Sequence, residues 1–231
     1  ILCDPDLPGS LAYSIRGMLD AATAARDQLS GDTWLALTDL DQALVPLQAQ
    51  ASGLAQSDQR NVTQDALSST MRGLLAFAGL ATESMVRDPG WAFMDAGRRL
   101  ERALSVATML RYTLVTVRST AAESLILESV LVAAESIITY RRRYRSHAQV
   151  ETLLDLLLLD VDNPRSVLHQ LDLLEREMSA LPHVESPRFT TEQRLALQLA
   201  TTVRVLDTAA VSKTTAGAGT GDEPGRPALA E

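Results

Sequence analysis

The chain has 231 residues, of which 46% are hydrophobic and 4% aromatic, so a core built mainly from Leu, Val and Ala favours helices over a β-sandwich. Acidic residues outnumber basic ones by 29 to 21, and the formal net charge of −8 argues against a general nucleic-acid-binding protein. The single cysteine, Cys3, excludes an internal disulfide framework, and no apolar run approaches the ~20 residues of a membrane helix, so we expect a cytoplasmic protein.

Helical periodicity of apolar residues dominates the first part of the sequence. A first helix is expected over residues 10–22, and a second from about residue 32 until Pro46 bends or ends it. Residues 51–61 are polar and patternless, which indicates a loop. A third helix is expected from about Gln64 to Val86.

The middle of the chain begins with the dipeptide Asp88-Pro89. This is a strong helix start, because a capping carboxylate is followed by proline at the first helical position. The helix behind it is expected to extend through Leu110 and as far as Val117. The next helix, from about Glu123 to Tyr144, is apolar almost all round and is therefore expected in the middle of the bundle.

The last part of the sequence indicates shorter helices and then a tail. A helix over residues 150–158 precedes Asn163-Pro164, which repeats the cap-and-proline signal, and a last helix is expected at 191–206. Residues 211–231 are rich in Gly, Ala, Thr and Pro, which indicates a disordered tail. The sequence thus predicts one all-α domain over residues 1–210, an up-and-down bundle of about seven or eight helices.

Charged residues interrupt the helix that follows Asp88-Pro89. Arg98, Glu101 and Arg102 lie three and four residues apart, so they share a helical face and can pair. One interpretation is an arginine fork that presents donors to a carboxylate or phosphate, with the glutamate holding it in place. The other is an ion-pair network between neighbouring helices, which is the commoner cause of such a pattern.

Two glutamates stand within the apolar helix that follows. Glu128 and Glu135 are seven residues apart, which would place both carboxylates on one edge of a continuous helix, ~10 Å from each other. Such a pair could bind a metal or share acid–base work. However, no Glu-x-x-His partner is present, and the three histidines lack ligand spacing, so no metal site is predicted. The glutamates are instead expected to receive the arginines of the preceding helix.

The same helix is expected to end in a cluster of arginines and tyrosines. Tyr140, Arg141 and Arg145 belong to the run Tyr-Arg-Arg-Arg-Tyr-Arg. Arginines suit a helix C-terminus, where the carbonyl dipoles favour cations. We rank a solvated or ion-paired helix end first, an anion site second, and nucleic-acid stacking by the tyrosines third.

A further candidate for anion binding lies just before residue 167. Here Arg165 and the hydroxyl of Ser166 stand in the expected first turn of a helix, next to Asp160 and Asn163. A helix N-terminus with such donors can cradle an anion. An ordinary capped helix start would read the same way, and both interpretations stay open.

Several of these segments together resemble one bacterial family. They are Pro8–Leu11, Arg26–Trp34, Trp91–Ala103 with the pattern Trp-x-Phe-x-x-x-Gly-Arg-x-Leu-Glu-Arg-Ala, Thr139–Tyr144, and Leu158–Ser166. Across residues 5–182 the chain resembles the alpha-E domain family, which is all-helical. Members usually begin with a first copy of an Arg-x-x-Glu-Arg-Ala helix, which has no match here, so N-terminal helices of the domain are expected to be missing.

The resemblance also implies partners. Members are typically fused to, or encoded beside, an ATP-grasp ligase of circularly permuted type and a transglutaminase-like protein. An accessory role in forming or processing amide bonds on a peptide is therefore implied, with such a ligase as partner in cis or in trans. No cofactor, metal, nucleic acid or membrane is expected, while a homo-oligomer is compatible with the sequence.

Three functional hypotheses follow. The leading one is a non-catalytic helical module that offers an Arg/Glu patch to a partner ligase or an anionic peptide. The first alternative is an enzyme that uses Glu101, Glu128 or Glu135 as acid–base group and arginines to bind a carboxylate substrate. The second is a structural bundle that dimerises. The candidate patch comprises Arg98, Glu101, Arg102, Glu128, Glu135, Tyr140, Arg141, Arg145, Asp160, Asn163, Arg165 and Ser166.

Overall fold

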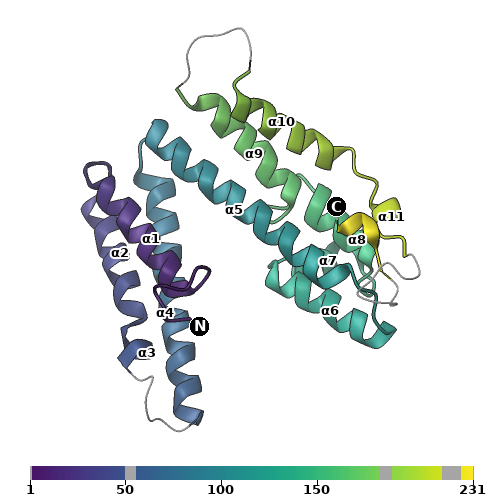
Figure 1. The fold of residues 1–231 in the computed structure, drawn as a ribbon, viewed down its shortest axis with the longest axis horizontal. Coiled ribbons are helices and arrows are strands. Elements are labelled where there is room, and N and C mark those ends of the chain that lie inside the picture. The colour runs from purple at the N-terminus through teal and green to yellow at the C-terminus, as the bar shows by residue number, and fades with distance from the viewer. Residues whose placement is uncertain (1, 50–55, 183–188, 215–224, 231) are drawn as a thin grey trace. The chain divides into compact units, whose positions relative to one another are not determined.

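The computed structural model describes residues 2–49, 56–182, 189–214 and 225–230, and these residues are predominantly helical (Figure 1). Within them no β-strand occurs, and an isolated antiparallel bridge joins Thr116 to Gly225. The prediction of an all-α fold is therefore confirmed. The contacts divide the chain into two compact units, Ile1–Arg87 and Asp88–Glu231.

The first unit is built from amphipathic helices that pack on one another. Its helices are α1 (Leu11–Ala24), α2 (Gly31–Ala43), α3 (Val45–Ala49) and α4 (Gln56–Ser84). Ser10 caps α1 as expected, and α2 begins at Gly31 with Ser30 as its cap, slightly earlier than the expected start at about residue 32. Of the predicted loop 51–61, residues 50–55 lie outside the described residues, and the remainder belongs to α4, which starts earlier than expected.

The core of this unit lies where α2 meets α4. Leu37 and Leu40 are fully buried, and the absence of a side chain at Gly73 lets α4 approach α2 closely. A Cβ atom built on Gly73 would lie 2.8 Å from Cγ of Leu40. A glycine is therefore required at this helix crossing by packing and not by backbone conformation.

In the described residues, the second unit is built from helices of very different length and two short helical turns. They are α5 (Pro89–Leu114), α6 (Thr120–Ala133), α7 (Ile137–Tyr144), α8 (Val150–Leu154), the π-helical turn η2 (Asp155–Leu159), α9 (Val167–Ala180), α10 (Thr191–Arg204), α11 (Thr208–Val211) and the 3₁₀ turn η3 (Pro227–Leu229). Asp88 caps α5, and Thr190 caps α10 in a reciprocal capping box with Gln193. Both helix starts agree with the sequence prediction because capping depends on adjacent residues alone.

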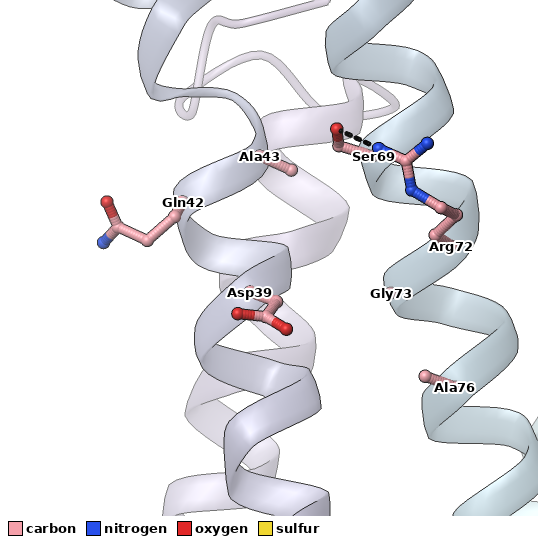
Figure 2. A pocket seen from close by; sticks show the side chains of 7 residues that line it. All are labelled: Asp39, Gln42, Ala43, Ser69, Arg72, Gly73 and Ala76. Carbon is pink, nitrogen blue, oxygen red and sulfur yellow. Dashed lines mark hydrogen bonds between the residues drawn. The ribbon is translucent and has the colours of Figure 1, made fainter.

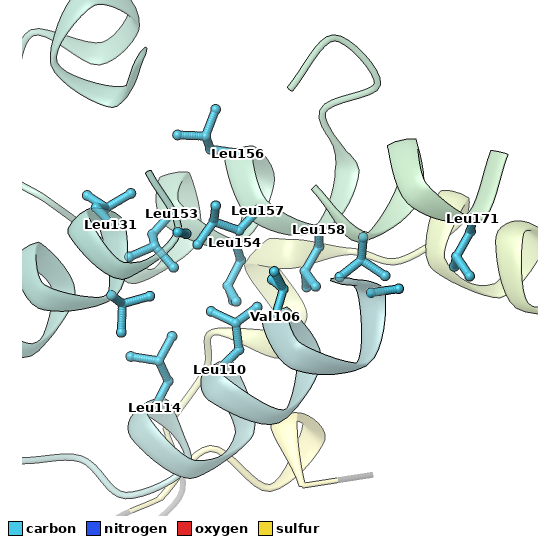
Figure 3. Close-up of a cluster of buried hydrophobic side chains, with 14 of the residues drawn as sticks. Val106, Leu110, Leu114, Leu131, Leu153, Leu154, Leu156, Leu157, Leu158 and Leu171 are labelled. Atoms are coloured by element: carbon cyan, nitrogen blue, oxygen red, sulfur yellow. The ribbon is translucent and has the colours of Figure 1, made fainter. Parts of the chain in front are cut away.

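The core of the second unit is a leucine cluster. The leucines of the run Leu153–Leu158 are buried against α5 and α6, with Leu110 and Leu131 among their neighbours (Figure 3). Along its length α5 packs mainly on α9, and α9 in turn packs on α10. This arrangement fixes the polar face of α5 beside the start of α9.

The predicted continuous helix 123–144 is wrong, because it breaks between α6 and α7. Glu135 adopts a left-handed conformation with φ 49°, and the backbone N–H of Ser136 donates to the carbonyl of Leu131 at 2.8 Å. This is the hydrogen-bond pattern of a Schellman helix end, for which glycine is the usual residue. The helix pair is not central either, since Val132 and Ile138 are 59% and 70% exposed.

Two more expectations need revision at the C-terminal side. Ser166, and not Asn163, caps α9, because its Oγ accepts the N–H of His169 at 3.1 Å. In the predicted tail, residues 215–224 and 231 lie outside the described residues, but 225–230 pack on the unit and bury Arg226. None of the described helices is long and apolar enough to cross a membrane.

Candidate functional site

The polar face of α5 is organised around a buried carboxylate. Asp95 is 1% exposed and accepts hydrogen bonds from two arginines one turn further on. Arg98 donates through Nη2 to Oδ1, and Arg99 donates through Nε to Oδ2 at 3.0 Å. Charged side chains are rarely buried without a partner, so Asp95 and these arginines stabilise one another. Both guanidinium groups are thereby held in fixed positions.

Arg99 also connects α5 to α9. Its Nη1 donates to Oε1 of Gln170 at 3.3 Å, and Nε2 of the same glutamine donates to the carbonyl of Pro164. Gln170 is 1% exposed, so both halves of its amide are satisfied inside the protein. A single buried glutamine therefore fixes the loop before α9 against the arginine face of α5.

The loop itself is held by a buried asparagine. Nδ2 of Asn163 donates to Oγ of Ser136 at 3.2 Å and to the carbonyl of Leu156 at 3.0 Å. Its Oδ1 accepts the backbone N–H of Arg165 at 3.1 Å, which closes an Asx turn. The position of Arg165 is thus set by a rigid, hydrogen-bonded turn and not by a flexible loop.

Asp160 and Ser166 complete this turn. Oγ of Ser166 donates to the carbonyl of Asp160 at 2.5 Å, while the carboxylate of Asp160 accepts a hydrogen bond from Arg143 of α7, also at 2.5 Å. This hydrogen bond raises the pKa of Arg143. Asp160 and Ser166 therefore act as supports of the loop, and their polar groups are already occupied by the protein.

Arg102 differs from its neighbours because it has no partner among the residues that the structure describes. It is half-buried, and within the described part of the chain its guanidinium makes no hydrogen bond or ion pair. Burial lowers the pKa of Arg102 most, and the positive charges of Arg98, Arg165 and Arg99 lower it further. Asp95 acts in the opposite direction. Arg102 is thus a partly desolvated cation surrounded by other cations.

We refer to Arg98, Arg99, Arg102 and Arg165 as the arginine cluster. Besides Asp95, one more carboxylate of the described residues pairs with the cluster, that of Glu135, which binds Arg165. The side chain of Glu135 is 70% exposed, and exposed ion pairs contribute about 0–1 kcal/mol. The positive charge of the cluster is therefore only partly compensated by the protein.

Other predicted site residues lie apart from this cluster or are occupied. Glu128 pairs with Arg141 at 2.7 Å between two exposed side chains, so neither predicted glutamate receives an arginine from the preceding helix. Tyr140 is buried, and its hydroxyl accepts the N–H of Gln149 and shares a hydrogen bond with Thr152. It therefore has a structural role and connects α7 to the start of α8. Glu101 and Arg145 are exposed, and neither belongs to this cluster.

Asp95, Arg99 and Gln170 were not among the site residues predicted from the sequence. The spacing of Asp95 with the arginines at 98 and 99 is the same three- and four-residue signal that singled out Glu101. The sequence pattern therefore contained two possible carboxylate partners, and the structure selects the buried one. Gln170 carries no such local signal, because its partners lie in other elements.

Four pockets formed by described residues are not lined by Glu101, Glu128 or Glu135. The first unit has a pocket of about 530 Å³ between α2 and α4. Figure 2 shows Asp39 and Gln42 on one side and a hydrogen-bonded Ser69–Arg72 pair on the other. In the described residues, no group of three or more His, Cys, Asp or Glu is placed to hold a metal ion.

Comparison with known proteins identifies the family. A family model matches residues 1–222, and its description is a predicted alpha-helical domain with a conserved ER motif. The chain belongs to the Alpha-E family. No solved structure matches this Alpha-E domain.

The domain also matches longer mycobacterial proteins. It is 44% identical over 179 residues to the uncharacterized protein Mb2597 of Mycobacterium bovis and to the uncharacterized protein Rv2567 of Mycobacterium tuberculosis. In each case the match covers 78% of this chain and 20% of the relative. This Alpha-E domain therefore spans about a fifth of the length of these curated relatives.

Proposed function

We propose that this Alpha-E chain is a non-catalytic binding module of a cytoplasmic peptide- or amide-ligase system, and that its arginine cluster receives an anionic group of the peptide or of the ligase. The observation that carries the proposal is the half-buried guanidinium of Arg102, which lies among three further arginines and has no partner in the described ranges of the chain. Like charges in a partly desolvated site repel one another. An incoming anion relieves this repulsion and gains charge-assisted hydrogen bonds.

The construction of the cluster supports a binding role. Arg98 and Arg99 are oriented by Asp95, and Arg165 is oriented by the Asn163 turn. Donors that are already held in place lose little conformational freedom when they bind, so more of the interaction energy appears as affinity. A purely structural ion-pair network would instead be expected to pair each of its charges.

The position of the glutamates favours binding over acid–base catalysis. Glu101 is exposed, and Glu128 and Glu135 each pair with an arginine at the surface. A general acid or base works best in a site where burial or neighbouring charges tune its protonation. These three side chains do not share such an environment in the described part of the chain.

The link to a ligase rests on the family resemblance and on the coverage of the relatives. A domain that makes up about a fifth of a longer protein can have an accessory role for the other parts of that protein. The Glu-Arg dipeptide occurs at residues 101–102 and again at 175–176. We assign the ER motif of the family to residues 101–102, because Arg102 belongs to the arginine cluster.

The test uses the full-length natural protein that contains this domain and the circularly permuted ATP-grasp ligase encoded with it. Affinity is measured by isothermal titration calorimetry, or by nucleotide turnover with the acceptor peptide where both parts share one polypeptide. Arg102→Ala is expected to weaken association by at least about tenfold, the value of one hydrogen bond to a charged group.

The matched control is Arg111→Ala. Arg111 lies on the same helix, is exposed, and makes no hydrogen bond or ion pair in the described part of the chain, so the net charge changes equally. This variant should stay within about twofold of the parent, as screened surface charges contribute little. Equal affinities of the Arg102→Ala and parent proteins, with both folded, would refute the proposal.

A further inference from the structure

The charge of the arginine cluster bears on the kind of anion that it accepts. Among the described residues, four guanidinium groups face two carboxylates, those of Asp95 and Glu135, so two positive charges are left over there. A single carboxylate would neutralise half of this excess. A phosphoryl group carries up to two negative charges at neutral pH and three strong acceptor oxygens.

The available donors also suit a compact anion with several oxygens. Nε of Arg98 is buried and has no hydrogen-bond partner in the described part of the chain, although Nη2 of the same side chain is bound to Asp95. The whole guanidinium of Arg102 is free of partners in that part. These two side chains are four residues apart on one face of α5, so their donors can converge on one group.

Arg165 approaches from the loop before α9 and brings its own competitor. Its Nη2 donates to Oε2 of Glu135, whose backbone is held at φ 49° by the α6–α7 helix end. The side chains of Arg165 and Glu135 are 37% and 70% exposed. Such a pair is weak enough for a ligand to displace, and an incoming anion must either displace Glu135 or share Arg165 with it.

We propose that the arginine cluster binds a phosphoryl dianion in preference to a single carboxylate, and that Glu135 competes with this ligand for Arg165. The inference deepens the proposed function, because it names the chemical class of the anion received by the same site. It makes no use of the ligase. Failure of either proposal can therefore be recognised separately.

The complete chain is titrated with inorganic phosphate, sulfate and acetate at constant ionic strength. NMR or calorimetry measures the binding affinity of each anion. Phosphate and sulfate at pH 8 should bind at least about tenfold more tightly than acetate, since each extra charged contact has about that value. On lowering the pH to 5, phosphate affinity should fall, because inorganic phosphate is mainly a dianion at pH 8 and a monoanion at pH 5. Sulfate remains a dianion and should keep its affinity.

Variants separate the roles of the residues. Arg102→Ala should abolish the preference for dianions, and Arg102→Lys, which keeps the charge but loses the planar fork, should retain part of it. Glu135→Gln should tighten phosphate binding by up to about fivefold, the range of an exposed ion pair. Glu128→Gln is the control, because it removes the same charge from an exposed pair with Arg141 on the same helical pair.

Phosphoserine and AMP distinguish two small-molecule sources of the phosphoryl group. Tighter binding of one than of inorganic phosphate identifies the better carrier, and equal binding shows that the phosphoryl group alone is read. Acetate binding as tightly as sulfate would overturn the inference, as would a dianion affinity that Arg102→Ala leaves unchanged. If Glu135→Gln matches Glu128→Gln, the competition by Glu135 is refuted.

The two proposals fail in different ways. Phosphate binding that depends on Arg102, together with ligase association that does not, would refute the proposed function and leave the phosphoryl site in place. Ligase association that depends on Arg102, with no preference for dianions, would refute the phosphoryl site alone.

Discussion

Arg226 offers a sharp test of how the C-terminal segment 225–230 is held. Its side chain is 5% exposed and donates to three different elements: Nη2 to Glu123 at 2.6 Å, Nη1 to the carbonyl of Leu114 at 2.9 Å, and Nε to the carbonyl of Ser212 at 3.2 Å. Its backbone N–H donates to Val115 at 2.8 Å. Arg226→Met keeps most of the aliphatic stem and removes all three side-chain bonds.

The expected cost follows from these contacts. A hydrogen bond to a charged group contributes about 1.5–3 kcal/mol, and a neutral one contributes about 1 kcal/mol. The sum is not realised in full, because segment 225–230 can detach and expose Glu123 and the two carbonyls to water. The loss is therefore limited by the free energy of docking, and we expect about 2–4 kcal/mol. At roughly 3 °C per kcal/mol for a unit of this size, the melting temperature falls by about 6–12 °C.

Thermal unfolding monitored by circular dichroism measures this cost, with Arg111→Met as the exposed control on α5. Hydrogen exchange supplies a local readout, since the amide of Arg226 should lose its protection in the variant. A double-mutant cycle with Glu123→Gln isolates the ion pair from the two carbonyl bonds. A melting temperature within about 2 °C of the control, with the amide still protected, would show that the segment is held by other contacts.

Three further substitutions probe packing and the site. Gly73→Ala should destabilise the first unit by about 1–3 kcal/mol in chemical denaturation because the new Cβ meets Leu40, whereas Gly79→Ala, with open space around it, should be neutral or stabilising. Asp95→Ala should cost about 2–4 kcal/mol by leaving two arginines without their buried carboxylate, and sulfate should restore part of the melting temperature. Asn163→Ala should lose about 1–3 kcal/mol and lower phosphate affinity in the same titration, because the turn before α9 is released.

Local signals in the sequence predicted those parts of the fold that depend on adjacent residues. The start of α5 follows from Asp88-Pro89 and that of α1 from Ser10, because a cap involves residues three positions apart. The break at Glu135 was not predictable in this way. A left-handed residue at a helix end is usually glycine, and glutamate gives no comparable signal.

The candidate site shows the same division. Helical spacing placed Arg98 and Arg102 on one face, and the turn before α9 placed Arg165 near a helix start. That these side chains belong to one cluster depends on the packing of α5 against α9, which Gln170 fixes over a separation of 71 residues. The contact of Arg226 with Leu114, which lies 112 residues away in the sequence, could not be predicted either, because a single anchoring residue produces no periodic pattern.

The two Glu-Arg dipeptides show why environment decides the chemistry of this domain. Arg176 follows Glu175 and is exposed, at the edge of a pocket of about 440 Å³ that Asp172 and Arg204 also line. Two carboxylates, those of Asp172 and Glu175, balance the two arginines that line this pocket. Asp172 pairs with Arg204, and Glu175 lies next to Arg176 in the sequence. Arg102 has the same predecessor in sequence but lies half-buried among cations. The environment of Arg102 leaves positive charge uncompensated, whereas that of Arg176 does not. Arg176→Ala should therefore not alter phosphate affinity in the titration that Arg102→Ala disrupts.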